Sequence, residues 1–188
     1  MTTTLPAVVR ELEAHAAEAG WDQPARLFAL VPTDDLVAAE PGLADLLADK
    51  RGGLTAVEQE PLKAEQSLEE VLLSAVWPVG VAGVAAIAER VVLPPQADDE
   101  VPTDPAAASA YANEHPDREE VRIVAAATRA GETFCAVRLR SHDDDASVMA
   151  GDNLVPGLLD LLQASLVEDP DPTDDPDQPE PSDEETQQ

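Results

Sequence analysis

The chain contains few cysteines, aromatic residues and basic residues, and these shortages exclude or disfavour several kinds of site and partner. Its 188 residues include one cysteine, five aromatic side chains, and 11 basic against 39 acidic residues, which gives a formal net charge of -28. A single cysteine excludes an internal disulfide and a zinc site built from several cysteines. The strong negative charge argues against direct binding of nucleic acid or of an anionic membrane surface.

The sequence also lacks a long apolar run. The longest stretch without a charged or strongly polar residue is the 14 residues from 75 to 88, and Pro78, Gly80 and Gly83 interrupt it. It is too short to span a bilayer. The first residues have neither the basic start nor the apolar stretch of a signal peptide. We therefore expect a cytoplasmic protein without a membrane partner.

The sharpest change of composition occurs at residue 168. Residues 168–188 contain ten acids, five prolines and no basic residue, and no apolar side chain there is larger than proline. Nothing in this segment can repay the entropy cost of folding. The sequence predicts a disordered acidic tail at 168–188 after a single domain at 1–167, in which 96–118 forms an acidic, proline-containing insertion.

Apolar spacing and breaker residues predict the order of the elements. Helical spacing covers 5–19, 68–76 and 156–167, and Ser67 with Glu70 matches a capping box. Apolar runs at 26–31, 54–60 and 79–93 predict strands. Shorter helices are expected between Thr33 and Gly52 and from Asp104 to Asn113. These elements favour an α+β fold with an antiparallel or mixed sheet and helices mainly on one side.

A β-hairpin is the most definite local prediction. Two apolar stretches, 121–128 and 133–140, are separated by a turn that contains Gly131. An odd number of loop residues keeps apolar side chains on one face, because a slip of one residue exchanges the faces. We expect a loop of three or five residues, with Ile123 opposite Leu139 and Cys135 facing inward beside Ala127.

Standard catalytic and cofactor motifs are absent. No dinucleotide or phosphate-binding glycine loop and no nucleophile elbow occurs, so no catalytic residue and no cofactor is expected. Cys135 lacks a neighbouring base and is interpreted as a buried structural thiol. The acidic loop from His142 to Asp152 departs from the calcium-loop pattern and is interpreted as a solvated loop, with weak divalent binding as the alternative.

Arginine is concentrated in a few places in this acidic chain. The expected hairpin places three arginines on its outer face, and a fourth on the long strand could join them: Arg122, Arg138, Arg140 and Arg90. Like charges opposite each other on paired strands are destabilising unless they are countered. Three explanations remain open: salt bridges to Glu89, Glu119 or Glu120, an anionic ligand or acidic partner, or the chain's own tail.

Five stretches carry a family resemblance, and they lie at 20–31, 58–62, 77–95, 115–118 and 154–158. Over roughly residues 5 to 166 the chain resembles a conserved, uncharacterised actinobacterial protein family, which implies no catalytic residue. More distantly, the order of elements is similar to the secretion-chaperone and YbjN-like α+β topology. That second likeness has no motif behind it, and the residues at 33–66 and 96–118 depart from it.

Three functional hypotheses follow from these observations. The first is a non-enzymatic, cytoplasmic protein-binding or adaptor module, similar to a chaperone, with a protein partner. The second is a protein or enzyme that binds a small anion through the arginine-lined face. The third is an acidic decoy for basic proteins. An exposed apolar patch would favour the first hypothesis, and a cavity lined by arginines would favour the second.

Overall fold

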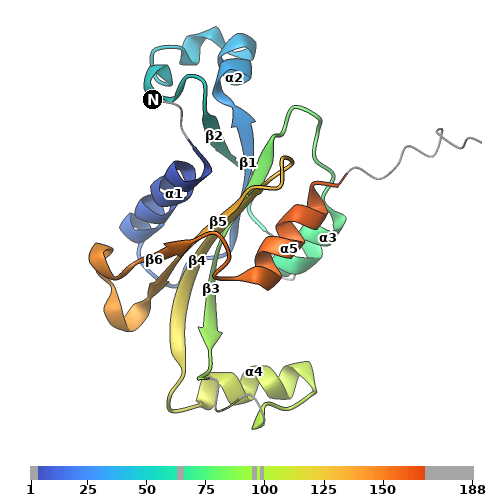
Figure 1. Ribbon diagram of the computed structural model, residues 1–188. Helices are drawn as coiled ribbons and strands as arrows, with labels where there is room; N and C mark the ends of the chain where they lie inside the picture. Colours follow the sequence, from blue (N-terminus) through green and yellow to red (C-terminus); the bar gives the residue numbers. More distant parts are fainter. Residues whose placement is uncertain (1–3, 63–65, 95–96, 98–99, 168–188) are drawn as a thin grey trace, which may run out of the picture.

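A single antiparallel sheet forms the centre of the protein (Figure 1). The computed structural model describes residues 4–62, 66–94, 97 and 100–167. The described strands are ordered β2-β1-β3-β4-β5-β6. They span Arg26–Pro32 (β1), Leu54–Glu58 (β2), Gly83–Val92 (β3), Glu119–Thr128 (β4), Thr133–Leu139 (β5) and Met149–Gly151 (β6). The α+β class and the antiparallel sheet expected from the sequence are therefore confirmed.

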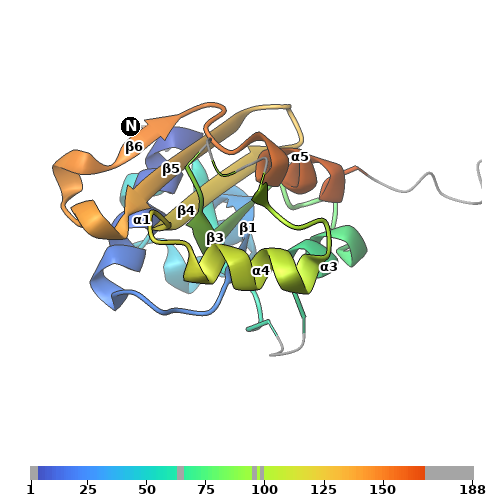
Figure 2. The same ribbon diagram turned by 90° about the horizontal axis from the view of Figure 1, so that it is seen from below.

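The helices divide between the two faces of this sheet. They span Leu5–Ala19 (α1), Thr33–Ala39 (α2), Leu68–Ser74 (α3), Pro105–Glu114 (α4) and Pro156–Ser165 (α5). Helices α3 and α5 pack on one face, and α1 covers the other. Figures 1 and 2 show α4 beyond the end of the sheet at which β3 ends and β4 begins. The helices thus lie on both faces, because the central strands carry apolar side chains on each.

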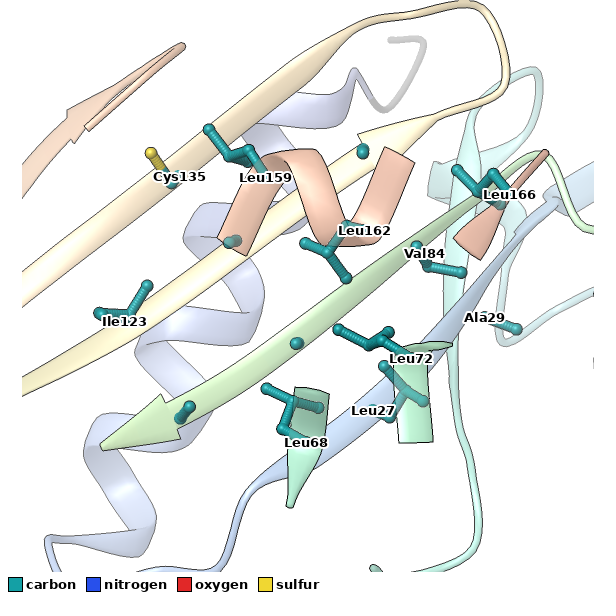
Figure 3. Close-up of a cluster of buried hydrophobic side chains, with 14 of the residues drawn as sticks. Leu27, Ala29, Leu68, Leu72, Val84, Ile123, Cys135, Leu159, Leu162 and Leu166 are labelled. Atoms are coloured by element: carbon teal, nitrogen blue, oxygen red, sulfur yellow. The ribbon is translucent and has the colours of Figure 1, made fainter. Parts of the chain in front are cut away.

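Small aliphatic residues build the two halves of the core. Beneath α3 and α5 the sheet contributes alternate residues of β3, β4 and β5, which meet Leu68, Leu72, Leu159 and Leu162 (Figure 3). Beneath α1 the opposite set of alternate residues meets Val9 and the rest of its apolar stripe. Alanines in the sheet allow the helices to approach closely, which explains how a core with so few aromatic residues is filled.

Local signals set the ends of several elements. Ser67 and Glu70 form the expected capping box at the start of α3. Asp104 caps α4 by accepting a hydrogen bond from the backbone N–H of Ala107. Gly20 follows α1 with φ 82°, a conformation that favours glycine. The helices expected from capping and spacing therefore form near the expected residues.

The β4–β5 hairpin has the expected parity but a different register. Thr128 and Glu132 close a three-residue loop in which Gly131 adopts φ 86°. Ile123 pairs with Val137 and Ala125 with Cys135, so the pairing expected from the sequence was wrong by two residues. Each side chain still points to the expected face, because a slip of two preserves the alternation.

Other boundaries differ from the sequence expectation. Strand β3 begins at Gly83 instead of residue 79, since Pro78 and Gly80 hold the preceding residues in a loop. Strand β6 forms inside the loop that was expected to be irregular. Between α2 and β2 only short 3-10 turns form, at Pro41–Leu43 and Ala48–Lys50. The tail expected at 168–188 lies outside the described residues, so the domain boundary at 167 stays a prediction.

Gly83 marks a close approach of two strands at the start of β3. It pairs with Thr128 at the end of β4. A Cβ atom on residue 83 would lie 2.5 Å from the carbonyl oxygen of Ala127. This distance leaves no room for a side chain, so glycine allows β3 to enter the sheet beside β4.

Candidate functional site

Arg138 lies buried between α1 and the loop that follows β5. Its side chain is 3% exposed, and its guanidinium makes two hydrogen bonds to the Glu13 carboxylate, at 2.6 and 2.9 Å. Asp145 accepts a third at 2.8 Å, and Asp143 contacts Nη1 at 3.3 Å. Hydrogen bonds to Glu13, and after them the one to Asp145, raise the pKa of Arg138 above its ordinary value. The geometry is that of an internal ion pair.

Arg122 lies next to Arg138 across the hairpin and is also buried. The two residues are direct partners in the β4–β5 register. Arg122 contacts Glu89 at 3.2 Å, donates to the carbonyl of Gly20, and stacks on Trp21 with 4.3 Å from its guanidinium carbon to the ring centre. Its Nη1 atom is buried without a hydrogen-bond partner. Charge and stacking thus hold most of this side chain in place.

Arg140 closes the same cluster at its exposed side. It makes hydrogen bonds to both carboxylate oxygens of Asp22 at 2.8 Å and to Glu120 at 2.6 Å. The hydrogen bond from Arg140 lowers the pKa of Asp22 below its ordinary value. Trp21 lies 5.5 Å from the Arg140 guanidinium carbon as well. Salt bridges from Asp22 and stacking of Trp21 therefore hold the loop after α1 against the hairpin.

The fourth arginine expected on this face lies elsewhere. Arg90 pairs with Val121 in the β3–β4 register, which places it on the face covered by α3 and α5, and it contacts Glu69 at 2.8 Å. The placement of Arg90 with the other three was wrong, because its position in β3 has the opposite parity. We call the remaining three, Arg122, Arg138 and Arg140, the arginine cluster.

The arginine cluster contains more negative than positive charge. Its salt bridges involve six carboxylates: Glu13, Asp22, Glu89, Glu120, Asp143 and Asp145. Two of these partners, Glu89 and Glu120, were expected from the sequence, whereas Glu119 instead accepts a hydrogen bond from Ser141. Two of the three arginines are almost fully covered. This surface therefore does not present an open row of positive charge.

The other candidate chemical groups lack catalytic geometry. The Cys135 thiol is fully buried beneath α5, near Leu159 (Figure 3), and contacts the Gly151 carbonyl and the Leu154 N–H. The Ser141 hydroxyl lies between Glu119 and His142 Nδ1. This order differs from a catalytic triad, in which histidine stands between the acid and the hydroxyl.

Two further kinds of feature, metal-binding clusters and membrane spans, are missing from the part of the chain that the structure describes. There, no three or more histidine, cysteine or acidic side chains gather in a way that could hold a metal ion. Likewise, no described helix combines the length and the apolar character needed to cross a membrane. An open cavity of about 810 Å³ lies near the start of α1, but the residues that line it include neither a basic residue nor histidine or cysteine.

Four exposed aliphatic residues lie on segments near the end of the sheet where β3 begins, which is opposite to the arginine cluster. We call these four residues the apolar patch: Leu73 (73% exposed), Val76 (90%), Val79 (83%) and Val167 (75%). They come from α3, from the loop between α3 and β3, and from the second residue after the end of α5. Figure 1 shows this loop beside the end of α5.

Arg129 holds the segments of the apolar patch together. Its guanidinium donates hydrogen bonds to the carbonyls of Val81 at 2.9 Å, Trp77 at 3.0 Å and Leu166. The Trp77 indole also donates to the Ser165 hydroxyl at 3.3 Å. Val76 precedes Trp77 and Val167 follows Leu166, so the same hydrogen bonds fix where both exposed valines lie.

A groove adjoins the apolar patch on the side of β2. Its volume is about 430 Å³, and it is lined by Leu27, 59–62, Gln66, Val71 and 74–77. Val76 therefore belongs to both the groove and the apolar patch. Glu60 is the charged residue among these lining residues. The groove is thus lined by both apolar and polar side chains, the latter including Gln59, Gln66 and Ser74, with one carboxylate among them.

The apolar patch was not predicted from the sequence, for a local reason. Val79 was expected to lie in a central strand, where its side chain would be buried, and the preceding helix was expected to end at 76. The signal was present in Pro78 and Gly80, which flank Val79 and are typical of a loop. A large aliphatic residue between two loop-forming residues has no strand neighbour to cover it.

A family model covers most of the chain. A family model described as PPA1309-like protein matches residues 5–167. No curated protein and no solved structure matches the chain. The match includes every described helix and strand, from the first residue of α1 to the last residue of the apolar patch. The chain belongs to the PPA1309-like protein family.

Proposed function

We propose that this protein is a non-enzymatic protein-binding module, an adaptor or chaperone-like protein, which binds its partner through the apolar patch and the adjoining groove. One observation carries the proposal: four aliphatic side chains that are 73–90% exposed come from α3, the loop after it and the end of α5, and hydrogen bonds from Arg129 hold that loop beside the end of α5. Single exposed aliphatic residues are common on protein surfaces. A group of them beside a groove is typical of an interaction site.

The way in which the patch is built supports this proposal. Arg129 uses hydrogen bonds to backbone carbonyls to hold the loop and the end of α5 in place. A surface that is ordered before binding loses less conformational entropy when a partner arrives. The groove next to Val76 offers a place for a partner's side chain, as an anchor residue requires.

A second candidate function is binding of a small anion at the arginine cluster. The buried Nη1 atom of Arg122, which has no hydrogen-bond partner, favours it. Six carboxylates in the same cluster oppose it, because an anion would have to displace groups that already form hydrogen bonds with the guanidinium groups. We therefore rank this candidate below protein binding.

The proposed setting is the cytoplasm of an actinobacterium. The single cysteine supports a reducing compartment, and the predominance of arginine over lysine is typical of a GC-rich genome. The likeness in element order to secretion chaperones and YbjN-like proteins agrees with a chaperone-like role. Fold likeness alone does not establish function, so the proposal rests on the apolar patch.

The test compares partner capture by three full-length proteins in the native host. One is the natural chain, one carries Leu73→Ser, Val76→Ser and Val79→Ser, and one is a matched control with Leu46→Ser, Val92→Ser and Met149→Ser. The control positions are also exposed aliphatic residues but lie outside the patch. Co-purifying proteins are quantified by mass spectrometry.

We expect a partner that the natural chain and the control variant capture equally and that the patch variant loses by about tenfold or more, as removal of anchor residues predicts. Equal capture by all three proteins would contradict the proposal. Binding of phosphate by the natural chain, with no partner that depends on the patch, would favour the anion-binding candidate instead.

A further inference from the structure

We infer that two copies of this chain pair through strand β2, so that the sheet continues from one molecule into the other. This inference goes beyond the proposed function and uses a surface other than the apolar patch. Three observations on the described residues support it: the direction of the backbone groups of β2, the side chains that self-pairing brings together, and the difference between the two edges of the sheet.

The first observation is which backbone groups of β2 face away from the sheet. Among the described strands, β2 has β1 as its one neighbour, so it is an edge strand. The N–H of Thr33 donates to the carbonyl of Gly53, and the N–H of Gln59 donates to the carbonyl of Leu27, both at 2.9 Å. The odd-numbered residues of β2 therefore face β1. The even-numbered residues direct their N–H and C=O groups outward: Leu54, Ala56 and Glu58.

These outward groups lack partners within the described part of the chain. There, no hydrogen bond joins the backbone N–H or C=O of an even-numbered residue of β2 to another residue. The strand pairs with β1 residue by residue, without a bulge, and contains neither proline nor lysine. Bulges, prolines and lysines are the features that protect exposed edges. The charged side chain of β2, Glu58, already accepts hydrogen bonds from Arg26 at 2.6 and 2.8 Å.

The second observation is that β2 is complementary to itself in one antiparallel register. When Ala56 lies opposite Ala56 of a second copy, the outward residues of both copies form three pairs, each with two main-chain hydrogen bonds. Other registers leave some outward residues unpaired. In this register Glu58 lies opposite Leu54, so like charges do not face each other. Thr55 lies opposite Val57, and β-branched residues pair well on a sheet.

Val57 adds apolar surface to this pairing. Its side chain is 36% exposed. It pairs with Ala29 of β1, and Ala29 belongs to the core beneath α3 and α5. Val57 therefore lies on that face at the margin of the core. A second copy of β2 places Thr55 beside it and removes part of this apolar surface from water.

The third observation is that the two edges of the sheet differ. Strand β6, at the other edge, has three residues. The N–H of Thr128 donates to the carbonyl of Glu132, and this bond sets the alternation along β5. By that alternation Ala150 is the outward residue of β6. One outward residue supports one pair, whereas β2 supports three, so we expect pairing at β2.

The charge of the chain opposes this association. Each copy has a formal net charge of -28, and two such molecules repel one another. Salt screens this repulsion, over about 10 Å at 0.1 M. An interface that is one strand wide belongs to the class of small, weak contacts. We therefore expect a weak dimer that becomes tighter as the salt concentration rises.

The test measures self-association by sedimentation velocity. Protein concentrations run from about 5 to about 500 µM, at about 50 and about 300 mM salt. The full-length proteins are the natural chain, Ala56→Pro, and the matched control Ala150→Pro. Each substitution removes one outward N–H from an edge strand and none that faces the neighbouring strand, a position at which proline is tolerated. Thermal unfolding checks that both variants keep the fold.

We expect the natural chain and Ala150→Pro to dimerise alike, and more tightly at the higher salt concentration. Ala56→Pro should raise the dissociation constant of the dimer by about tenfold or more, because it removes both hydrogen bonds at the two-fold axis. The patch variant of the capture experiment should dimerise like the natural chain, since its changes lie outside β2.

A second measurement does not depend on proline. Cα atoms in a hydrogen-bonded antiparallel pair lie about 5.5 Å apart, which is within reach of a disulfide. With oxidised glutathione as the oxidant, Ala56→Cys should form a disulfide-linked dimer, and Ala150→Cys should remain mostly monomeric. The natural Cys135 is fully buried and should not contribute. Electrophoresis without reducing agent separates the two forms.

Four results would overturn the inference. They are a natural chain that stays monomeric at the highest protein and salt concentrations, a dimer that salt weakens, equal dimerisation of Ala56→Pro and the natural chain, and equal cross-linking of the two cysteine variants. A dimer that the patch variant loses and Ala56→Pro retains gives the third of these results and moves the interface to the apolar patch. None of these results bears on capture of another protein through the patch, so the proposed function is tested separately.

Discussion

The arginine cluster and the apolar patch differ in whether their side chains are paired and covered or left exposed to solvent. Arginines at 122 and 138 occur on the strand face that also holds the core under α1, yet each is drawn into contact with carboxylates and covered. Leu73, Val76 and Val79 remain in solvent although burial would be favourable. The two buried arginines are thus paired with carboxylates of the same chain, whereas these apolar side chains stay exposed.

This comparison leads to opposite expectations for mutations. Changes in the arginine cluster should mainly alter the free energy of unfolding, because its members are buried and paired. Changes in the apolar patch should mainly alter binding.

Replacement of Arg138 should cause the largest loss. Arg138→Met leaves the carboxylate of Glu13, whose side chain is 8% exposed, without its hydrogen-bonded counter-charge. Breaking a buried ion pair from one side costs about 3 to 5 kcal/mol. Urea denaturation should show this as a lower midpoint with a similar slope.

A double variant provides the control for that loss. Arg138→Met with Glu13→Leu removes both charges, and replacing a whole buried pair by apolar groups is often close to neutral. The double variant should therefore recover most of the stability that the single variant loses. Equal losses in the two variants would show that the ion pair is not the source of the effect.

Replacement of Arg129 should have an intermediate effect. Arg129→Met removes the donors that face the carbonyls of Trp77, Val81 and Leu166, at a cost of about 1 to 3 kcal/mol for acceptors left without donors. Hydrogen exchange should increase in the loop between α3 and β3 and at the end of α5. Unchanged exchange in both segments would mean that Arg129 does not hold them together.

Removal of the capping box should cost less. Ser67→Ala loses the side-chain acceptor for the Glu70 N–H at the start of α3, a change typically worth about 1 kcal/mol. Thermal unfolding should move to a lower midpoint, while Ser67→Asp, which restores an acceptor at the same position, should retain most of the stability. A Ser67→Ala midpoint equal to that of the natural chain would contradict the capping role.

The smallest effect on stability is expected for the apolar patch. Leu73→Ser, Val76→Ser and Val79→Ser change side chains that are 73–90% exposed, and surface substitutions usually fall within about 0.5 kcal/mol each. Urea denaturation should give nearly the natural midpoint. A loss as large as that of Arg138→Met would show that these residues support the fold, and the contrast with the arginine cluster would fail.

The sequence predicts the elements better than it predicts the long-range contacts. Helical spacing, the capping box and the parity of the hairpin are local patterns, and the structure contains all three. The exact hairpin register was out of reach, because Thr128 closes the loop with Glu132 through backbone hydrogen bonds that side-chain patterns do not determine. Any register shifted by two residues satisfies the same alternation.

The candidate sites depend on contacts between distant residues. Arg138 and Glu13 are separated by 125 positions, and nothing near either residue indicates that they meet. The expectation of an exposed arginine face assumed that the hairpin's second face was open to solvent. It became covered because the apolar stripe of α1 packs on that face and brings Glu13 with it. Tertiary packing therefore decided the environment of these charges.

Gly83 has a consequence for how this family can vary. No L side chain fits at residue 83 while the carbonyl of Ala127 lies 2.5 Å from where its Cβ would be. We therefore expect relatives to keep glycine at this position, even where neighbouring core residues exchange among alanine, valine and isoleucine. In a relative with a larger residue here, the start of β3 would have to move away from the end of β4. The loop before β3, which carries Val79, would move with it.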